Sequence, residues 1–161
     1  MRFGDCHFVP AVTISLVMSI SGTLWPSESL SFAGLSARTT LKAVQQRYPH
    51  STFVGNRLYV SETDARDHIY AIELYPEPPR RIRIVFERNH QGRQSYPRCE
   101  QIIATIRKEH GEPASVQEFR EERSKNRRLT WRRGKEDLSL LCFRMGAQPL
   151  FAAELTITTD P

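Results

Sequence analysis

Charge is missing from the N-terminal part of the sequence, where Phe8–Ser27 contains no Asp, Glu, Lys or Arg. Such a run behind a short basic head, here Arg2, is typical of a secretory signal, which has an apolar core of roughly 7–15 residues followed by small residues. A membrane-spanning helix needs about 20 apolar residues, and Pro10 and several serines dilute this run. The sequence therefore predicts a signal peptide over residues 1–30, cleaved between about 21 and 33. An uncleaved signal anchor and a buried N-terminal element of a cytoplasmic protein are the alternatives.

Motifs for catalysis and metal binding are also missing. The sequence has no H-E-x-x-H or C-x-x-C spacing for a metal, no G-x-S-x-G nucleophile elbow and no glycine-rich phosphate loop. The acidic pairs Glu121-Glu122 and Glu136-Asp137 lie on or beside predicted strands, where neighbouring side chains point to opposite faces. Structural or surface roles are expected for His50, His68, His90 and His110. We predict no catalytic residue, no metal site and no cofactor, and expect a protein that is not an enzyme.

Cysteine is scarce, with three in the chain, and Cys6 falls inside the predicted signal. The other two, Cys99 and Cys142, lie on the apolar faces of a predicted helix and a predicted strand. In an oxidising compartment, two inward-facing cysteines favour a disulfide. The chain-entropy model assigns such a bridge roughly 4 kcal/mol of stabilisation. The alternative is a pair of buried free thiols that act as small apolar side chains.

The chain beyond the predicted signal, about 130 residues, has the size of one domain. A hydrophobic fraction of 39% and a low glycine content of 8 residues support a packed core. We therefore predict a single α+β domain over residues 31–161, with two sub-units at about 32–90 and 95–160.

Each sub-unit is predicted to be one helix followed by strands. Thr39–Tyr48 and Pro97–His110 carry apolar residues at helical spacing, and alternating apolar residues follow each of them. The clearest predicted strand is Arg81–Glu87. Short turns between successive strands favour antiparallel pairing. The predicted fold class is α+β, as two tandem units of one helix followed by antiparallel strands, with the helices packed on one face of the sheet.

Arginine dominates the net charge of +5, because only four of the 23 basic residues are lysines. Two arginine pairs lie on predicted strands and would form one basic wall if both strands turn their polar faces to the same side: Arg81 and Arg83, and Arg128 and Arg132. Guanidinium groups suit carboxylates and phosphates, so this wall predicts an acidic partner surface. Nucleic acid is not expected, because no aromatic residues are interleaved with the basic face. The alternative is a solvated face whose arginines pair with Glu87, Glu118 and Glu121.

Two segments resemble a superfamily of small exported domains that includes the β-lactamase inhibitor protein and the small lipoprotein of the outer-membrane assembly machine. The first is Phe32–Leu35, ahead of a short helix ending at Tyr48-Pro49. The second runs from Cys99 to His110-Gly111-Glu112-Pro113, with Cys142 later in the chain. The resemblance implies tandem helix-and-strand units behind an export signal, and a protein-binding or inhibitory role. The chain lacks the lipid-anchor cysteine of the lipoprotein, so a lipid anchor is not expected.

Together these observations predict an exported protein, periplasmic or secreted, that binds an acidic envelope or secreted protein without catalysis. No stable membrane insertion is expected after cleavage of the signal. An envelope-acting enzyme with a dispersed active site and a purely structural domain are the alternatives.

Overall fold

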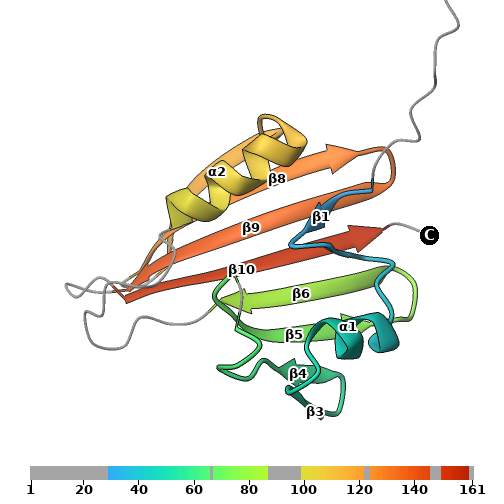
Figure 1. Cartoon of the computed structure of the whole chain (residues 1–161). Helices are drawn as coiled ribbons and strands as arrows, with labels where there is room; N and C mark the ends of the chain where they lie inside the picture. The colour runs from blue at the N-terminus through green and yellow to red at the C-terminus, as the bar shows by residue number, and fades with distance from the viewer. Residues whose placement is uncertain (1–28, 66, 87–98, 122–123, 146–149, 160–161) are drawn as a thin grey trace, which may run out of the picture.

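One antiparallel sheet of eight strands dominates the described part of the computed structural model (Figure 1). The structure describes residues 29–65, 67–86, 99–121, 124–145 and 150–159. The strand order is β3-β4-β5-β6-β10-β9-β8-β7, and β1 and β2 form a separate two-stranded sheet. The strands are β1 (Ser31–Phe32), β2 (Leu35–Ser36), β3 (Thr52–Val54), β4 (Arg57–Tyr59), β5 (Ile69–Tyr75), β6 (Arg80–Phe86), β7 (Ser115–Glu121), β8 (Ser124–Arg133), β9 (Glu136–Met145) and β10 (Leu150–Thr159). The helices are α1 (Leu41–Arg47) and α2 (Cys99–His110).

The predicted fold class, two tandem units of one helix followed by antiparallel strands with the helices packed on the sheet, is wrong. The described chain is mostly β, and its C-terminal strand β10 pairs with β6 on one side and with β9 on the other. Leu155 of β10 lies opposite both Ile84 and Leu140. Strand β10 therefore pairs with one strand from each predicted sub-unit, β6 and β9. The strands of the two predicted sub-units join in this way into one continuous sheet.

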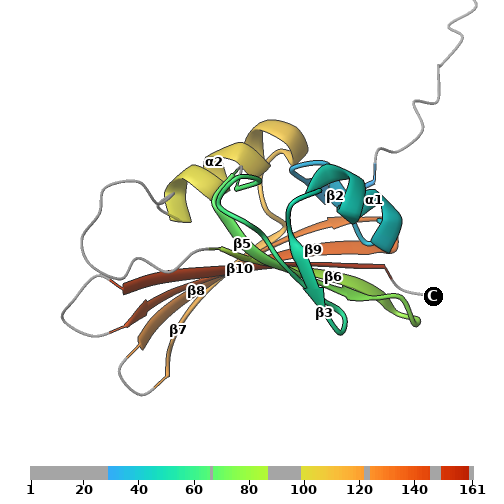
Figure 2. The same cartoon turned by 60° about the horizontal axis from the view of Figure 1, so that its bottom comes forward.

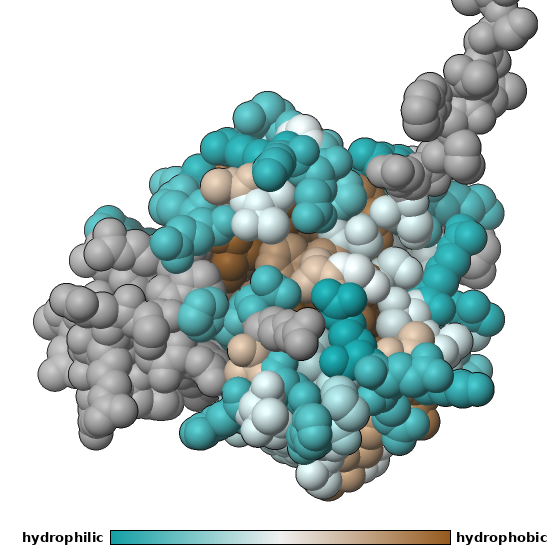
Figure 3. Space-filling view, in the orientation of Figure 1, coloured by the Kyte–Doolittle hydropathy of each residue, from teal (hydrophilic) through white to brown (hydrophobic). Residues whose placement is uncertain are grey.

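The core lies against one face of this sheet, on the side where Figure 2 shows α1, α2 and β2. Side chains alternate along each strand, so every second residue points to that side. The sheet contributes a set of side chains that are at most 2% exposed: Leu58, Ile72, Ile82, Ile84, Leu129, Trp131, Leu138, Leu140, Leu155 and Ile157. Figure 3 looks onto this side, and hydrophobic residues gather in the middle of it, below α2.

Helix α1 is short and has few buried residues. The Thr40 side chain caps its N-terminus by accepting a hydrogen bond from the Ala43 amide. Val44 and the C-terminal capping residue Tyr48 are its buried contacts, at 0% and 2% exposure. Pro49 follows, and a helix does not normally continue up to a proline. The helix covers most of the predicted range Thr39–Tyr48.

Helix α2 has the predicted apolar stripe, with Ile102, Ile103 and Ile106 buried. It ends at His110, and the following Gly111 has a left-handed φ of 79° and an amide that donates to the Arg107 carbonyl at 2.8 Å. Glycine adopts this conformation without the strain of a Cβ atom. The Trp131 indole Nε1 donates to the Gly111 carbonyl at 2.9 Å. This bond fixes the C-terminal end of α2 to β8.

Ser29 and Leu30, which the sequence assigns to the signal, belong to the fold. The Leu30 amide and the Ser29 hydroxyl both donate to the buried Glu136 carboxylate, at 2.7 and 2.8 Å. Leu30 itself is 1% exposed. The rest of the predicted signal lies outside the described residues. Within the described residues, no helix has the length and apolar character needed to span a membrane.

Candidate functional site

The face of the sheet opposite the core, here called the open face, carries the predicted arginines. Its side chains alternate with the buried ones, and the register brings together Arg57 and Tyr59 of β4, Glu73 and Tyr75 of β5, Arg81 and Arg83 of β6, Glu154, Thr156 and Thr158 of β10, Asp137 and Ser139 of β9, and Arg128, Thr130 and Arg132 of β8. The four arginines therefore share one face. They form two groups, because β10 and β9 lie between β6 and β8.

An ion-pair network ties the first group together. Arg83 Nη1 lies 3.1 Å from Glu73 Oε2, and Arg83 Nη2 lies 2.6 Å from Glu154 Oε2. Arg57 pairs with the same Glu73 at 3.4 Å, and the Tyr75 hydroxyl donates to it at 3.0 Å. The hydrogen bond to Glu154 raises the pKa of Arg83 above its ordinary value, against partial desolvation. The positive charge of Arg83 is thus balanced by two carboxylates, and its side chain connects β5, β6 and β10.

The other predicted arginines are more exposed. The Arg81 guanidinium carbon lies 4.1 Å from the centroid of the Tyr75 ring, and the Arg128 guanidinium carbon lies 5.4 Å from that of Phe119. Such stacking supports the guanidinium plane while its N–H groups at the edge can still reach a partner. Arg132 donates to both oxygens of Asp137, at 2.8 and 3.2 Å. The open face therefore combines stacked and paired arginines.

The two described carboxylates among those expected to pair with these arginines have other partners. Glu87 lies outside the described residues. Glu118 contacts Arg127, which points to the other side of β8, at 3.7 Å. Glu121 accepts a hydrogen bond from Asn126 at 3.4 Å. The observed partners are Glu73, Asp137 and Glu154, which sequence reasoning missed because they are far along the chain or across a turn.

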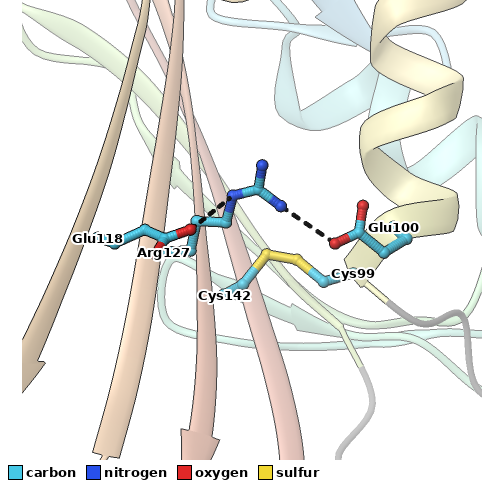
Figure 4. Close-up of a disulfide and its surroundings, with 5 residues drawn as sticks. All are labelled: Cys99, Glu100, Glu118, Arg127 and Cys142. Atoms are coloured by element: carbon cyan, nitrogen blue, oxygen red, sulfur yellow. Dashed lines mark hydrogen bonds and ion pairs between the residues drawn. A yellow bond between two sulfur atoms is a disulfide. The ribbon is translucent and has the colours of Figure 1, made fainter.

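The predicted disulfide between Cys99 and Cys142 is confirmed, with the two Cα atoms 6.2 Å apart. It ties the first residue of α2 to β9. Figure 4 shows Arg127 beside the disulfide, between Glu100 at 3.1 Å and Glu118 at 3.7 Å. These residues line a cavity of about 540 Å³ with both acidic and basic walls. Mixed charge of this kind does not select a ligand of one sign.

A second cavity of about 490 Å³ lies near the N-terminus of α1 and is here called the α1 groove. Four segments far apart in the sequence line it: Ala37–Leu41, Gly55-Asn56, Leu74–Pro76 and Arg80-Arg81. Of the described residues that line it, Arg38, Arg80 and Arg81 are charged and none is Asp or Glu. This groove could not be identified from the sequence, because no local motif joins the four segments.

His50 lies beside a buried carboxylate, that of Asp64, with Nδ1 2.9 Å from Oδ1. Asp64 also accepts hydrogen bonds from the His50 amide and the Ser51 hydroxyl, both at 2.8 Å. Burial opposes ionisation of this carboxyl, but the hydrogen bonds, led by that from His50, outweigh it and lower the pKa of Asp64. Because Ser51 donates to Asp64 and not to His50, the cluster lacks the nucleophile–base bond of a catalytic triad. Neither His50 nor Asp64 lines either of the two cavities.

The remaining histidines have different settings. His110 Nε2 lies 2.7 Å from the Ser31 carbonyl oxygen and helps to hold β1 against the end of α2. His68 is exposed, with a left-handed φ of 56°, and His90 lies outside the described residues. In the described ranges, no group of three or more His, Cys, Asp or Glu side chains is placed to hold a metal ion.

No protein-family model, curated protein or solved structure matches this chain. The resemblance to small exported domains therefore stays a prediction.

Proposed function

We propose that this chain is an exported binding domain, not an enzyme, that recognises an acidic protein through the open face. One observation carries the proposal: the strand register places Arg81, Arg83, Arg128 and Arg132 on the face opposite the core. Exposed guanidinium groups on a sheet present N–H donors in a fixed plane, and carboxylates of a partner can accept from them in pairs.

The main partner-contacting arginines are Arg81 and Arg128, which stack on aromatic rings, because Arg83 is already paired with Glu73 and Glu154. At Arg132, whose side chain is 68% exposed, a partner carboxylate would replace the existing pairing with Asp137. Three strand spacings separate β6 from β8, which corresponds to roughly 14 Å. The proposal therefore favours a partner that presents acidic groups at two positions about that far apart, and not a single isolated carboxylate.

Export to the periplasm or the exterior is part of the proposal, as is the resemblance to small exported protein-binding domains. The uncharged run Phe8–Ser27 and the Cys99–Cys142 disulfide support it, since disulfides persist mainly in oxidising compartments. Ser29 and Leu30 bind Glu136, so cleavage after either residue would remove contacts that hold β1. The cleavage site therefore lies before Ser29, within the earlier part of the expected window.

Exchange of two open-face charges tests the proposal. The protein is exported by its own signal, crosslinked to envelope and secreted proteins, and compared with the variant carrying Arg128→Glu and Arg132→Glu. Capture of the partner should fall at least about tenfold, because like charges across an interface cost several kcal/mol. The intact mass of the exported protein should correspond to a first residue at or before Ser29.

The control is Arg120→Glu with Lys125→Glu. This pair makes the same change in net charge at exposed positions, but these side chains alternate with the open face and line the cavity beside the disulfide. It should leave capture unchanged, and both variants should keep the wild-type circular dichroism. Equal capture by the wild type and the Arg128/Arg132 variant would remove the open face as the site. A full-length mass in the cytoplasmic fraction would contradict export.

A further inference from the structure

The α1 groove is built from segments that hold one another in place. The Leu74 amide donates to the Asn56 carbonyl at 2.9 Å, and the Asn56 side chain donates to the Leu74 carbonyl at 3.4 Å. On the other wall, the Ser36 amide donates to the Thr39 hydroxyl at 2.8 Å and the Thr39 amide donates to the Ser36 carbonyl at 3.0 Å. These bonds fix the two walls, so the groove is formed before any ligand arrives.

Its lining combines apolar surface with charge of one sign. Leu41 keeps 50% of its surface exposed, and Ala37, Leu74, Tyr75 and Pro76 add further apolar surface. Exposed leucine at a cavity is unused apolar area, and a ligand that covers it gains hydrophobic free energy.

The three guanidinium groups differ in what they already contact. Arg38 lies 3.5 Å from Glu136 and keeps a side-chain exposure of 70%. Arg81 stacks on Tyr75 on the open face, whereas Arg80, its neighbour on β6, is exposed and points to the side that carries α1. No described Asp or Glu lines the groove, so an anion that enters is attracted by Arg80 and by Arg38, whose charge is partly balanced by Glu136.

We propose that the α1 groove binds a small organic anion that has an apolar body, such as a medium-chain carboxylate. The carboxylate lies between Arg38 and Arg80, and the hydrocarbon part lies against Leu41 and Leu74. The cavity of about 490 Å³ falls within the range of roughly 300–1,000 Å³ that is usual for small-molecule sites. A neutral ligand would gain no attraction from the positive charge of the arginines. An inorganic anion would leave the apolar walls in contact with water.

Calorimetric titration of the oxidised protein with sodium octanoate tests this site. Octanoate should bind about tenfold more tightly than octanamide, which has a similar shape without the charge, because hydrogen bonds to a charged group are the stronger kind. It should also bind at least about tenfold more tightly than acetate or inorganic phosphate, which have charge without an apolar body. Equal affinity for octanamide would overturn the anion site, and equal affinity for acetate or phosphate would overturn the apolar part.

Variants of groove residues locate the binding. Arg80→Gln should weaken octanoate binding about tenfold, and Leu41→Asn should weaken it severalfold, through loss of charge and of apolar contact respectively. Lys42→Gln is the matched control, since Lys42 is the neighbouring exposed cation on α1 and does not line the groove. Octanoate affinity within twofold of wild type in both groove variants would overturn the proposal. Because Arg128 and Arg132 do not line the groove, this result is independent of the open-face experiment.

Discussion

The two sides of β10 are held together by different chemistry. Toward β9 and β8, the Cys99–Cys142 disulfide and the Trp131–Gly111 hydrogen bond fix both ends of α2. Toward β6 and β5, the corresponding connection is ionic, with Glu73 and Glu154 on either side of Arg83. Both halves bury apolar side chains on the core side, but one adds a covalent bond and the other adds charged groups on the open face.

The helices show the same contrast. Helix α2 buries three isoleucines, whereas α1 has Val44 as its one buried residue and relies on the capping residues Thr40 and Tyr48. Stability in the α2 half should therefore respond to reducing agents, and stability in the α1 half to pH and to single carboxylate substitutions. Three changes test this difference.

Removal of the disulfide should have the largest effect. Cys99→Ala with Cys142→Ala should lower the free energy of unfolding by about 4 kcal/mol, because the bridge closes a loop with a sequence separation of 43 residues and so limits the unfolded chain. Urea unfolding under non-reducing conditions measures the loss. Dithiothreitol should destabilise the wild type by a similar amount and leave the double variant unchanged. A loss below about 1 kcal/mol would contradict the covalent account of this half.

Glu73→Gln should have the next largest effect. The side chain of Glu73 is 8% exposed and its partners Arg57 and Arg83 are 32% and 36% exposed, so water partly compensates the loss. We expect a cost of about 2 kcal/mol, below the cost of breaking a fully buried pair. Glu118→Gln is the control, because Glu118 is 76% exposed and contacts Arg127 at 3.7 Å; its cost should be below about 0.5 kcal/mol. A cost for Glu73→Gln as small as that of Glu118→Gln would mean that the network adds no stability.

Sequence patterns predicted what depends on neighbouring residues. The helical spacing of apolar residues over Pro97–His110 indicated α2, whose buried side is formed by Ile102, Ile103 and Ile106. Alternation indicated most strands, and two inward-facing cysteines indicated the disulfide. These features can be predicted from the spacing of neighbouring residues alone. The disulfide also requires the assumption that the protein folds in an oxidising compartment.

The arrangement of the sheet could not be obtained in the same way. The insertion of β10 between β6 and β9 depends on register among strands more than 60 residues apart, as in the pairing of Leu155 with Ile84. Sequence patterns likewise did not reveal the contacts of Glu73 with Arg57 and Arg83. The α1 groove and the burial of Leu30 were missed for the same reason: each requires segments that meet only in the folded chain.

Asp64→Asn should have the smallest effect, and it should depend on pH. The pKa of Asp64 in the folded protein lies below its ordinary value of 3.8, because the hydrogen bonds from His50 and Ser51 outweigh burial. The stabilisation by this carboxylate is therefore complete above about pH 5 and is lost as the pH falls through the lower folded pKa. The difference in Tm between wild type and variant should shrink as the pH is lowered from 6 to 2. Glu62→Gln, an exposed change in the same loop, should show no such trend. A difference that stays constant with pH would show that Asp64 acts in this loop by shape alone, and the charged character of the α1 half would then rest on Glu73 and Glu154.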